Sequence, residues 1–294
     1  MLDCLVIGGG AAGLMAAVYL GRYRRNVLVI DDGGSRLAMI PTTRNVLGFP
    51  DGIAGPQLLE NMRLHAARFG VPMEAGRVES LYRRDDAGFE ATAGARRLSA
   101  RFVLLATGAR DVEPDIAGLA PSLKSGQVRY CPVCDGFETQ GRRVAVLGPQ
   151  AHGLREAAFV AGFGNEVTWL SMGSLRKVAV PELADLRASG VRVVDGRPRD
   201  IQCRPGHGVA VEMGEGQVLA FDVLYPALGL THASQLATTL GARAQDDGQL
   251  EVDDHFETTV PGLYAAGDVA VGLNQINVAA GQAAIAATAI HNRL

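Results

Sequence analysis

Short apolar runs alternate along the chain with small-residue or amphipathic stretches, and this alternation predicts strands interleaved with helices. Apolar strands are expected at 5–7 and 26–30, with a small-residue helix over 14–20 between them. Strands that alternate with helices favour an α/β fold built on parallel sheets. Further strands are expected at 78–89, 102–105, 144–147, 167–170, 191–194, 209–211, 223–228 and 262–268, and further helices at 56–69 and 277–290.

One region interrupts this alternation. Residues 33–57 are rich in glycine, proline and threonine, which is a composition typical of turns. We therefore expect a long loop here, and loops of this length are often functional.

A glycine-rich turn joins the first strand to the first helix. Gly8, Gly10 and Gly13 form the pattern G-x-G-x-x-G, and the second strand ends in Asp31 and Asp32. Such glycines permit a tight turn and let the backbone approach a pyrophosphate at the helix N-terminus, while the acid can bond a ribose hydroxyl. A tight turn without a ligand would use the same glycines. The strand, helix, second strand and terminal acid in register favour dinucleotide binding.

The same unit is repeated later in the chain. Ser171 follows Gly148 at the interval at which Asp31 follows Gly8, with a strand before each turn and after each helix. This internal similarity predicts two nucleotide-binding units. The second turn is altered, however. Pro149 removes a backbone donor, and Gln150 places a side chain where the backbone should approach a pyrophosphate.

Two cysteines lie between the two glycine turns. Cys131 and Cys134 are separated by two residues and followed by Asp135, which makes them a candidate redox dithiol. A structural disulfide is the alternative, but so short a loop removes little entropy from the unfolded chain. A zinc half-site is another alternative, and it needs two further ligands. Cys4 and Cys203 stand alone and offer no second pair.

Composition narrows the class of protein. The chain has 294 residues, of which 48% are hydrophobic, and this length is enough for two domains of ordinary size. Its net charge of −3 argues against nucleic-acid binding. We expect neither a signal peptide nor a membrane span, because glycines interrupt the first apolar run and no basic residues precede it. Four cysteines with one close pair suggest the reducing cytoplasm.

Four motifs follow one another along the chain: Gly8-x-Gly10-x-x-Gly13, Ala106-Thr107-Gly108, Cys131-x-x-Cys134-Asp135-Gly136 and Gly267-Asp268. In this order they resemble the low-molecular-weight thioredoxin reductase family, the class II FAD-dependent pyridine-nucleotide-disulfide oxidoreductases. The resemblance covers essentially the whole chain. It implies an α/β fold with two Rossmann-like (three-layer ββα) dinucleotide-binding domains, the second inserted into the first. An FAD-binding domain is expected over 1–111 plus 241–294, and a nicotinamide-nucleotide-like domain carrying the dithiol over 112–240.

The resemblance also implies which residues bind FAD, and that the enzyme is a homodimer. Asp268 would lie on the ribitol or pyrophosphate side of the cofactor, and Gln275 near the isoalloxazine ring. A turn or N-cap acid is the simpler interpretation of Asp268, and a surface glutamine that of Gln275. The FAD-binding residues implied are Gly8, Gly10, Ala11, Ala12, Gly13, Asp31, Asp32, Asn45, Ala106, Thr107, Gly108, Gly267, Asp268, Gln275 and Ile276.

Family likeness assigns different roles to the two cysteines. Cys134 would exchange electrons with the flavin, and Cys131 would attack a disulfide in a thioredoxin-like protein or a small molecule. Pro132 favours a helical φ, so Cys134 is expected near a helix N-terminus that stabilises its thiolate. Asp135 would donate and accept the proton if burial raises its pKa; a helix N-cap is its alternative role.

The chain departs from the family where NADPH should bind. The His-Arg-Arg that grips the 2′-phosphate falls on Ser171, Met172 and Gly173, and only Lys177 lies where a further arginine would be. NADP(H) is therefore a doubtful cofactor. His152 lies in the altered turn, where it is either a phosphate contact or a surface histidine.

Four functions remain open on the sequence. The chain is expected to be a disulfide reductase with another donor, such as ferredoxin. It could instead use NADPH through an atypical site, or act as a dithiol oxidase that passes electrons to oxygen. Relatives of the last kind tend to have His in place of Asp135, which counts against it. A flavin-binding regulatory protein with an idle cysteine pair is the alternative from another class.

Overall fold

The computed structural model describes residues 1–294 apart from 86–87, 120–121, 123–125, 205, 207 and 215. The chain divides into two compact units. The first comprises Met1–Arg110 and Leu230–Leu294, and the second comprises Asp111–Gly229. In the described part of the chain, no helix has the length and apolarity needed to cross a membrane.

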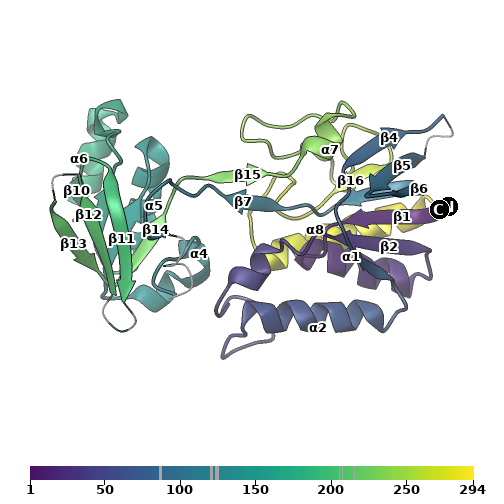
Figure 1. Ribbon diagram of the computed structural model, residues 1–294, viewed down its shortest axis with the longest axis horizontal. Helices are drawn as coiled ribbons and strands as arrows, with labels where there is room; N and C mark the ends of the chain where they lie inside the picture. The colour runs from purple at the N-terminus through teal and green to yellow at the C-terminus, as the bar shows by residue number, and fades with distance from the viewer. Residues whose placement is uncertain (86–87, 120–121, 123–125, 205, 207, 215) are drawn as a thin grey trace. The chain divides into compact units, whose positions relative to one another are not determined.

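A seven-stranded sheet forms the centre of the first unit (Figure 1). Its strands run in the order β3-β2-β1-β6-β5-β4, and β16 also pairs with β6. β3, β2, β1, β6 and β16 are parallel, while β5 pairs antiparallel with β4 and β6. Their bounds are β1 Leu2–Ile7, β2 Val27–Asp31, β3 Met73–Ala75, β4 Ser80–Arg83, β5 Phe89–Ala93, β6 Arg96–Leu105 and β16 Leu263–Ala265.

Alternation along β1 buries both faces of this sheet. Cys4 and Val6 face a cluster with helices α1 (Ala11–Arg22), α2 (Gly55–Ala67) and α8 (Ile276–Asn292). Leu5 and Ile7 face a second cluster, formed with β4, β5 and the short helix α7 (Gln235–Thr238). One face is thus covered by helices and the other by strands, which is the three-layer ββα arrangement.

The second unit repeats this layering on a smaller scale. Its parallel sheet runs in the order β10-β9-β8-β14, and a separate antiparallel sheet has the order β11-β12-β13. Helices α5 and α6 pack on one face of the parallel sheet, and the antiparallel strands pack on the other. The bounds are β8 Arg143–Leu147, α5 Gln150–Ala161, β9 Glu166–Leu170, α6 Val180–Ala188, β10 Arg192–Val194, β11 Pro198–Arg204, β12 Gly208–Met213, β13 Val218–Phe221 and β14 Val223–Pro226.

The α/β fold with two ββα units is confirmed, and two details of the sequence interpretation need correction. The second boundary lies between residues 229 and 230 rather than 240 and 241, because Ala237 of α7 is buried in the core of the first unit. The expected loop at 33–57 contains a 3₁₀ helix, η1 (Arg36–Met39), and the first residues of α2. Two short strands, β7 (Ala109–Asp111) and β15 (Leu230–His232), pair where the chain crosses between the units.

Candidate functional site

The first glycine turn leaves no room for side chains at its outer glycines. Gly8 has φ +111°, and a Cβ there would lie 2.2 Å from the carbonyl oxygen of Ala106. A Cβ at Gly13 would lie 1.9 Å from the carbonyl oxygen of Gly8. Gly10 is the N-cap of α1, and Ala11 and Ala12 are its first two residues. The turn therefore presents backbone at the helix N-terminus, as a pyrophosphate site requires.

Asp31 is fixed at the end of β2 by three donors. Its Oδ1 accepts hydrogen bonds from the backbone N–H of Gly9 at 3.1 Å and of Gly33 at 3.2 Å. Its Oδ2 lies 3.1 Å from Nη2 of Arg63, on helix α2. The neighbouring Asp32 accepts a bond from the Gly34 N–H at 3.1 Å and is exposed. Asp31 is thus held against the glycine turn, while Asp32 shapes the loop that follows.

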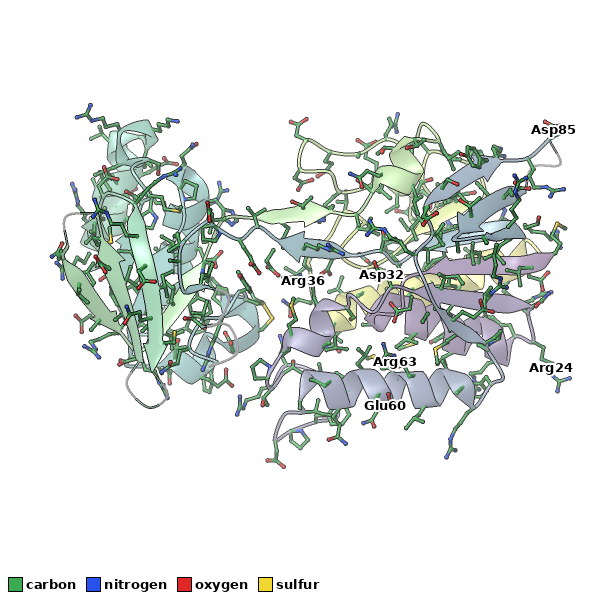
Figure 2. All side chains as sticks on the ribbon, in the orientation of Figure 1. Arg24, Asp32, Arg36, Glu60, Arg63 and Asp85 are labelled. Atoms are coloured by element: carbon green, nitrogen blue, oxygen red, sulfur yellow. A yellow bond between two sulfur atoms is a disulfide. The ribbon has the colours of Figure 1, made fainter. Side chains whose placement is uncertain are left out.

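A cavity of about 520 Å³ opens beside this carboxylate. Figure 2 labels Asp32 at the end of β2 and Arg63 on α2, which both contribute to its wall. A pocket of this volume next to an acid and a helix N-terminus fits the adenosine half of FAD. The lining residues are Gly9, Leu14, Asp31, Asp32, Gly33, Arg63, Met73, Ala75, Gly76 and Arg77.

Two more predicted motifs end strands of the same sheet. Ala106 follows β6, with its N–H bonded to the Ile7 carbonyl at 2.8 Å. Thr107 Oγ1 donates to the carbonyl of Ala233 at 2.8 Å, and the Ala233 N–H donates to the Gly108 carbonyl at 3.0 Å. These contacts make Ala106, Thr107 and Gly108 a structural junction.

Gly267 and Asp268 follow β16. The Gly267 N–H donates to Oε1 of Gln282 at 2.7 Å. The Asp268 carboxylate lies 2.8 Å from Nη1 of Arg36, so this acid is paired across the unit with the 3₁₀ helix η1. The Asp268 main-chain carbonyl lies 2.6 Å from Nδ1 of His232. The ion pair with Arg36 argues against a plain N-cap role for Asp268.

Asn45 and Gln275 are joined directly, although 230 residues separate them in sequence. Asn45 Nδ2 donates to Gln275 Oε1 at 2.8 Å, and Asn277 Nδ2 donates to the Asn45 carbonyl at 2.9 Å. Gln275 is the N-cap of α8, and Ile276 is the first residue of that helix. Gln275 is half-buried and fixed in place, so it is more than an unconstrained surface glutamine.

The cysteine pair lies in the second unit and is closed as a disulfide. Cys131 is the N-cap of the short helix α4 (Pro132–Asp135), and Pro132 is its first residue. The Cys134 N–H donates to the Cys131 carbonyl at 2.9 Å. Both cysteines are half-buried. Among the described residues there is no cluster of three or more metal-ligating side chains, which leaves the zinc interpretation without support.

Asp135 closes helix α4 and is held from two sides. Tyr225 Oη donates to its Oδ1 at 2.6 Å, and Arg129 Nη1 lies 3.4 Å from its Oδ2. Burial raises the pKa of Asp135, while the bond from Tyr225 and the charge of Arg129 lower it. Cys131, not Asp135, is the N-cap of this helix, so the alternative role as a helix cap does not apply.

The second glycine turn keeps its fold but not its open donors. Pro149 is the N-cap of α5, and Gln150 adopts a left-handed φ of +53°. The Gln150 N–H donates to Ser174 Oγ at 2.7 Å, and Ser174 Oγ donates to the Ser171 carbonyl at 2.6 Å. The backbone donor that would meet a pyrophosphate is therefore already bonded within the protein.

An acid reaches the strand end where arginines were missing. Ser171 Oγ hydrogen-bonds the Asp195 carboxylate, which comes from the segment after β10. This bond, with backbone donors at Gly196, Leu175 and Gly173, holds the pKa of Asp195 below its usual value. Arg176 and Lys177 lie nearby on the 3₁₀ helix η3 (Leu175–Lys177) and are exposed. The charged carboxylate of Asp195 would repel the 2′-phosphate of a nucleotide bound beside it.

His152 pairs with Glu156 one turn further along α5. The separation between His152 Nε2 and Glu156 Oε2 is 3.9 Å. Burial, followed by repulsion from Asp111, raises the pKa of Glu156 to about 7. Burial and the charge of Arg155 lower the pKa of His152. Glu156 Oε1 is buried without a hydrogen-bond partner among the described residues.

Sequence reasoning missed Tyr225, Ser174 and Asp195. Each acts through a contact between segments that are distant in sequence, and none belongs to a motif with fixed spacing. The available signal was a tyrosine within the apolar run of β14, where a phenol hydroxyl needs a partner if it is buried.

The chain is similar to known proteins over nearly its whole length. The family described as pyridine nucleotide-disulphide oxidoreductase matches residues 2–283. The thioredoxin reductase of Bacillus subtilis (strain 168) is 29% identical, over 99% of this chain and 94% of its own length. The crystal structure of HlmI superposes with a TM-score of 0.92 at 29% identity, covering 99% of this chain and 92% of that one. An oxidoreductase from Agrobacterium tumefaciens superposes with a TM-score of 0.86 at 30% identity, covering 99% and 97%.

Proposed function

Because the chain belongs to the pyridine nucleotide-disulphide oxidoreductase family and is a flavin-dependent disulfide oxidoreductase, we propose that its working pair is Cys131 and Cys134. In this proposal electrons move between FAD and the pair, and between the pair and a disulfide of a thioredoxin-like protein or small molecule. The disulfide in the second unit, next to the half-buried Asp135, supports this assignment.

The glycine turn and the carboxylates of the first unit are proposed to hold the cofactor. Gly8, Gly10 and Gly13 would meet the pyrophosphate, and Asp31 would bond the adenosine ribose. Asn45, Asp268 and Gln275 would contact the flavin half. When bound, FAD supplies reversible two-electron transfer.

The exchange step at the pair balances in atoms and electrons. The Cys131 thiolate attacks one sulfur of the substrate disulfide, whose other sulfur leaves as a thiolate and takes a proton. The Cys134 thiolate then attacks the Cys131 sulfur, which restores the Cys131–Cys134 disulfide and releases the second substrate thiolate. Two electrons and two protons reach the substrate. We assign the proton transfers to Asp135, which directly follows Cys134 in helix α4.

We propose that the electron donor is not NADPH, and that a one-electron carrier such as ferredoxin takes its place. The bond from the Gln150 N–H to Ser174 carries this proposal, because it occupies the donor on which pyrophosphate binding depends. The carboxylate of Asp195 adds repulsion at the place where a 2′-phosphate would lie.

Anaerobic stopped-flow reduction of the purified enzyme tests the donor. Reduced ferredoxin is expected to bleach the flavin absorbance quickly, while NADPH and NADH bleach it slowly and without saturation. A variant with Cys131→Ser and Cys134→Ser is the control, because its flavin should still accept electrons but turn over no disulfide. Rapid bleaching that saturates at micromolar NADPH would return the chain to the ordinary reductases. In a separate aerobic assay, dithiol-driven oxygen uptake would instead identify an oxidase.

Family membership and the small number of cysteines support one further proposal each. We propose a homodimer, which sedimentation equilibrium of the holoenzyme would test. We also propose that the enzyme works in the cytoplasm, where thiols stay reduced between turnovers.

A further inference from the structure

We infer that Tyr225 is a positioning residue, which holds Asp135 so that one defined carboxyl oxygen exchanges protons with the Cys131–Cys134 pair. The inference rests on the proposed function, since it assumes that Asp135 acts as the acid and base. It concerns groups within the second unit only.

Tyr225 meets Asp135 from inside the core. It lies on β14 and is 0% exposed, packed in the cluster that includes Leu154 and Ala157 of α5. Its hydroxyl donates to Asp135 Oδ1 at 2.6 Å. A buried phenol needs a partner for its proton, and here that partner is the side chain next to Cys134. The aromatic ring cannot move without disturbing the core, so the hydroxyl is a fixed reference point for the carboxyl group.

Arg129 contacts the other carboxyl oxygen. Its Nη1 lies 3.4 Å from Asp135 Oδ2, and its Nε donates to the Gly126 carbonyl at 2.9 Å. The Arg129 N–H bonds the Leu224 carbonyl at 3.0 Å, which ties this segment to the strand that carries Tyr225. Both partners of Asp135 are therefore placed by β14.

The contacts from Tyr225 and Arg129 differ in which protonation states of Asp135 they allow. Tyr225 can donate to Oδ1 whether Asp135 is a carboxylate or a carboxylic acid, because Oδ1 remains an acceptor in both states. Arg129 carries only donors, so it favours the carboxylate and does not hold the proton. Because Tyr225 keeps its bond to Oδ1 in both states, the exchangeable proton is assigned to Oδ2, where its uptake opposes the charge of Arg129.

The charged groups around Asp135 set the sign of the test. Burial raises its pKa most and Glu138 of the following 3₁₀ helix η2 (Phe137–Thr139) adds to this, whereas Tyr225 of β14 and Arg129 lower it. Removing the Tyr225 hydroxyl should therefore raise the pKa of Asp135 and leave Oδ1 without its donor. Proton delivery to a leaving thiolate should then become slower and depend on pH over a higher range.

The test compares two disulfides on the reduced enzyme, freed of excess reductant. Hydroxyethyl disulfide has a leaving thiol of ordinary pKa and needs a proton, while a nitrothiobenzoate disulfide has an acidic leaving thiol and does not. For Tyr225→Phe we expect exchange with hydroxyethyl disulfide to slow by about tenfold near neutral pH, with little change for the nitrothiobenzoate disulfide. The pH–rate profile of the first reaction should have a limb on which the rate falls as Asp135 loses its proton. This pH limb should move to higher pH in Tyr225→Phe.

Tyr264→Phe is the matched control. Tyr264 is also buried, and its hydroxyl accepts a hydrogen bond from Arg293 at 2.8 Å in the first unit, far in sequence from the pair. This variant should leave both exchange rates and the pH limb unchanged. An equal effect of Tyr264→Phe and Tyr225→Phe would overturn the inference, because it would show a general loss of packing.

Asp135→Asn separates the inference from the proposed function. If it abolishes the pH limb while Tyr225→Phe leaves the limb in place, Asp135 is the acid and Tyr225 does not position it. If Asp135→Asn itself leaves the limb unchanged, the proposed role of Asp135 fails and the inference fails with it. Should Tyr225→Phe not fold, 3-fluorotyrosine at position 225 replaces it. Its stronger donor should move the limb to lower pH, and an unmoved limb would overturn the inference.

Discussion

The two glycine turns show which glycines a fold needs and which a ligand needs. At Gly8 and Gly148 an added Cβ would lie 2.2 and 2.1 Å from a backbone oxygen, and at Gly13 and Gly153 it would lie 1.9 and 2.3 Å away. These outer glycines are kept in both units because the strand, turn and helix cannot pack without them.

The middle position differs between the turns. A Cβ at Gly10 would meet only Ser35 Oγ at 3.3 Å among the described residues, so the fold itself accepts a side chain there. In the second unit this position is Gln150, whose N–H is bonded to Ser174. A glycine that only a ligand requires has been replaced, while those that the packing requires remain.

The largest expected effect tests the outer glycines, which both turns have. Gly13→Ala and Gly153→Ala should each lower the free energy of unfolding by about 3 kcal/mol, because backbone atoms would have to move. Gly281→Ala is the control, since a Cβ on that exposed helical glycine has open space among the described residues. It should stabilise α8 slightly. Denaturant titration of the apoprotein measures all three, and a tolerated Gly13→Ala would contradict the close approach described here.

The next effect tests the difference between the turns. Gly10→Leu should leave the apoprotein folded, with a Tm near that of the wild type, but weaken FAD binding by about a hundredfold through blocked pyrophosphate contacts. Gln150→Leu is its counterpart and should leave FAD binding unchanged. Fluorescence titration of the apoprotein with FAD measures both. A full complement of FAD in Gly10→Leu would show that the pyrophosphate lies elsewhere.

A smaller effect should follow from partly restoring the second turn. Gln150→Gly combined with Met172→Arg should raise affinity for NADPH by about tenfold, the equivalent of one charge-assisted hydrogen bond. Calorimetric titration compares it with Gln150→Gly alone. NADH lacks the 2′-phosphate and should gain less from the arginine, so an equal gain for both nucleotides would refute this account of the strand end.

The smallest effect concerns the helices behind the turns. Glu156 of α5 occupies the place that Ala16 has in α1, and its pKa is raised to about 7 from 4.5. The folded state therefore holds this proton more tightly, so the contribution of Glu156 to stability is greatest below pH 4.5 and is lost as pH rises from 4.5 to about 7. Glu156→Gln should stabilise the protein by about 1 kcal/mol near pH 8, after allowance for partial exposure, and by nothing near pH 4. An equal gain at both pH values would contradict this cause.

Local sequence patterns were enough to predict most of the fold. Short continuous apolar runs located β1, β2, β8 and β9, and glycine spacing located both turns. The 3₁₀ helix at Arg36–Met39 was missed because its residues lie among turn-forming neighbours. The boundary after Gly229 was missed because only the burial of Ala237, a tertiary contact, assigns α7 to the first unit.

Candidate site residues could be proposed from the sequence wherever a motif has a fixed spacing. The cysteine pair with Asp135, the glycine turn and Asp31 could all be read from the chain in this way. Tyr225, Ser174 and Asp195 could not, because each meets its partner only after β14, β9 and β10 come together in one sheet. Likewise, the pairing of Arg36 with Asp268 joins two ends of the first unit that no local pattern relates.

The hydroxyl of Ser174 has a consequence for regulation. It is a tethered competitor for the Gln150 N–H, present at an effective concentration that dilution cannot lower, and a free nucleotide would have to displace it at every encounter. Under the proposed function, the rate of disulfide turnover would then not follow the cellular ratio of NADPH to NADP⁺. The enzyme would respond to the supply of a different electron carrier, and a cell could change one redox pool without changing the other.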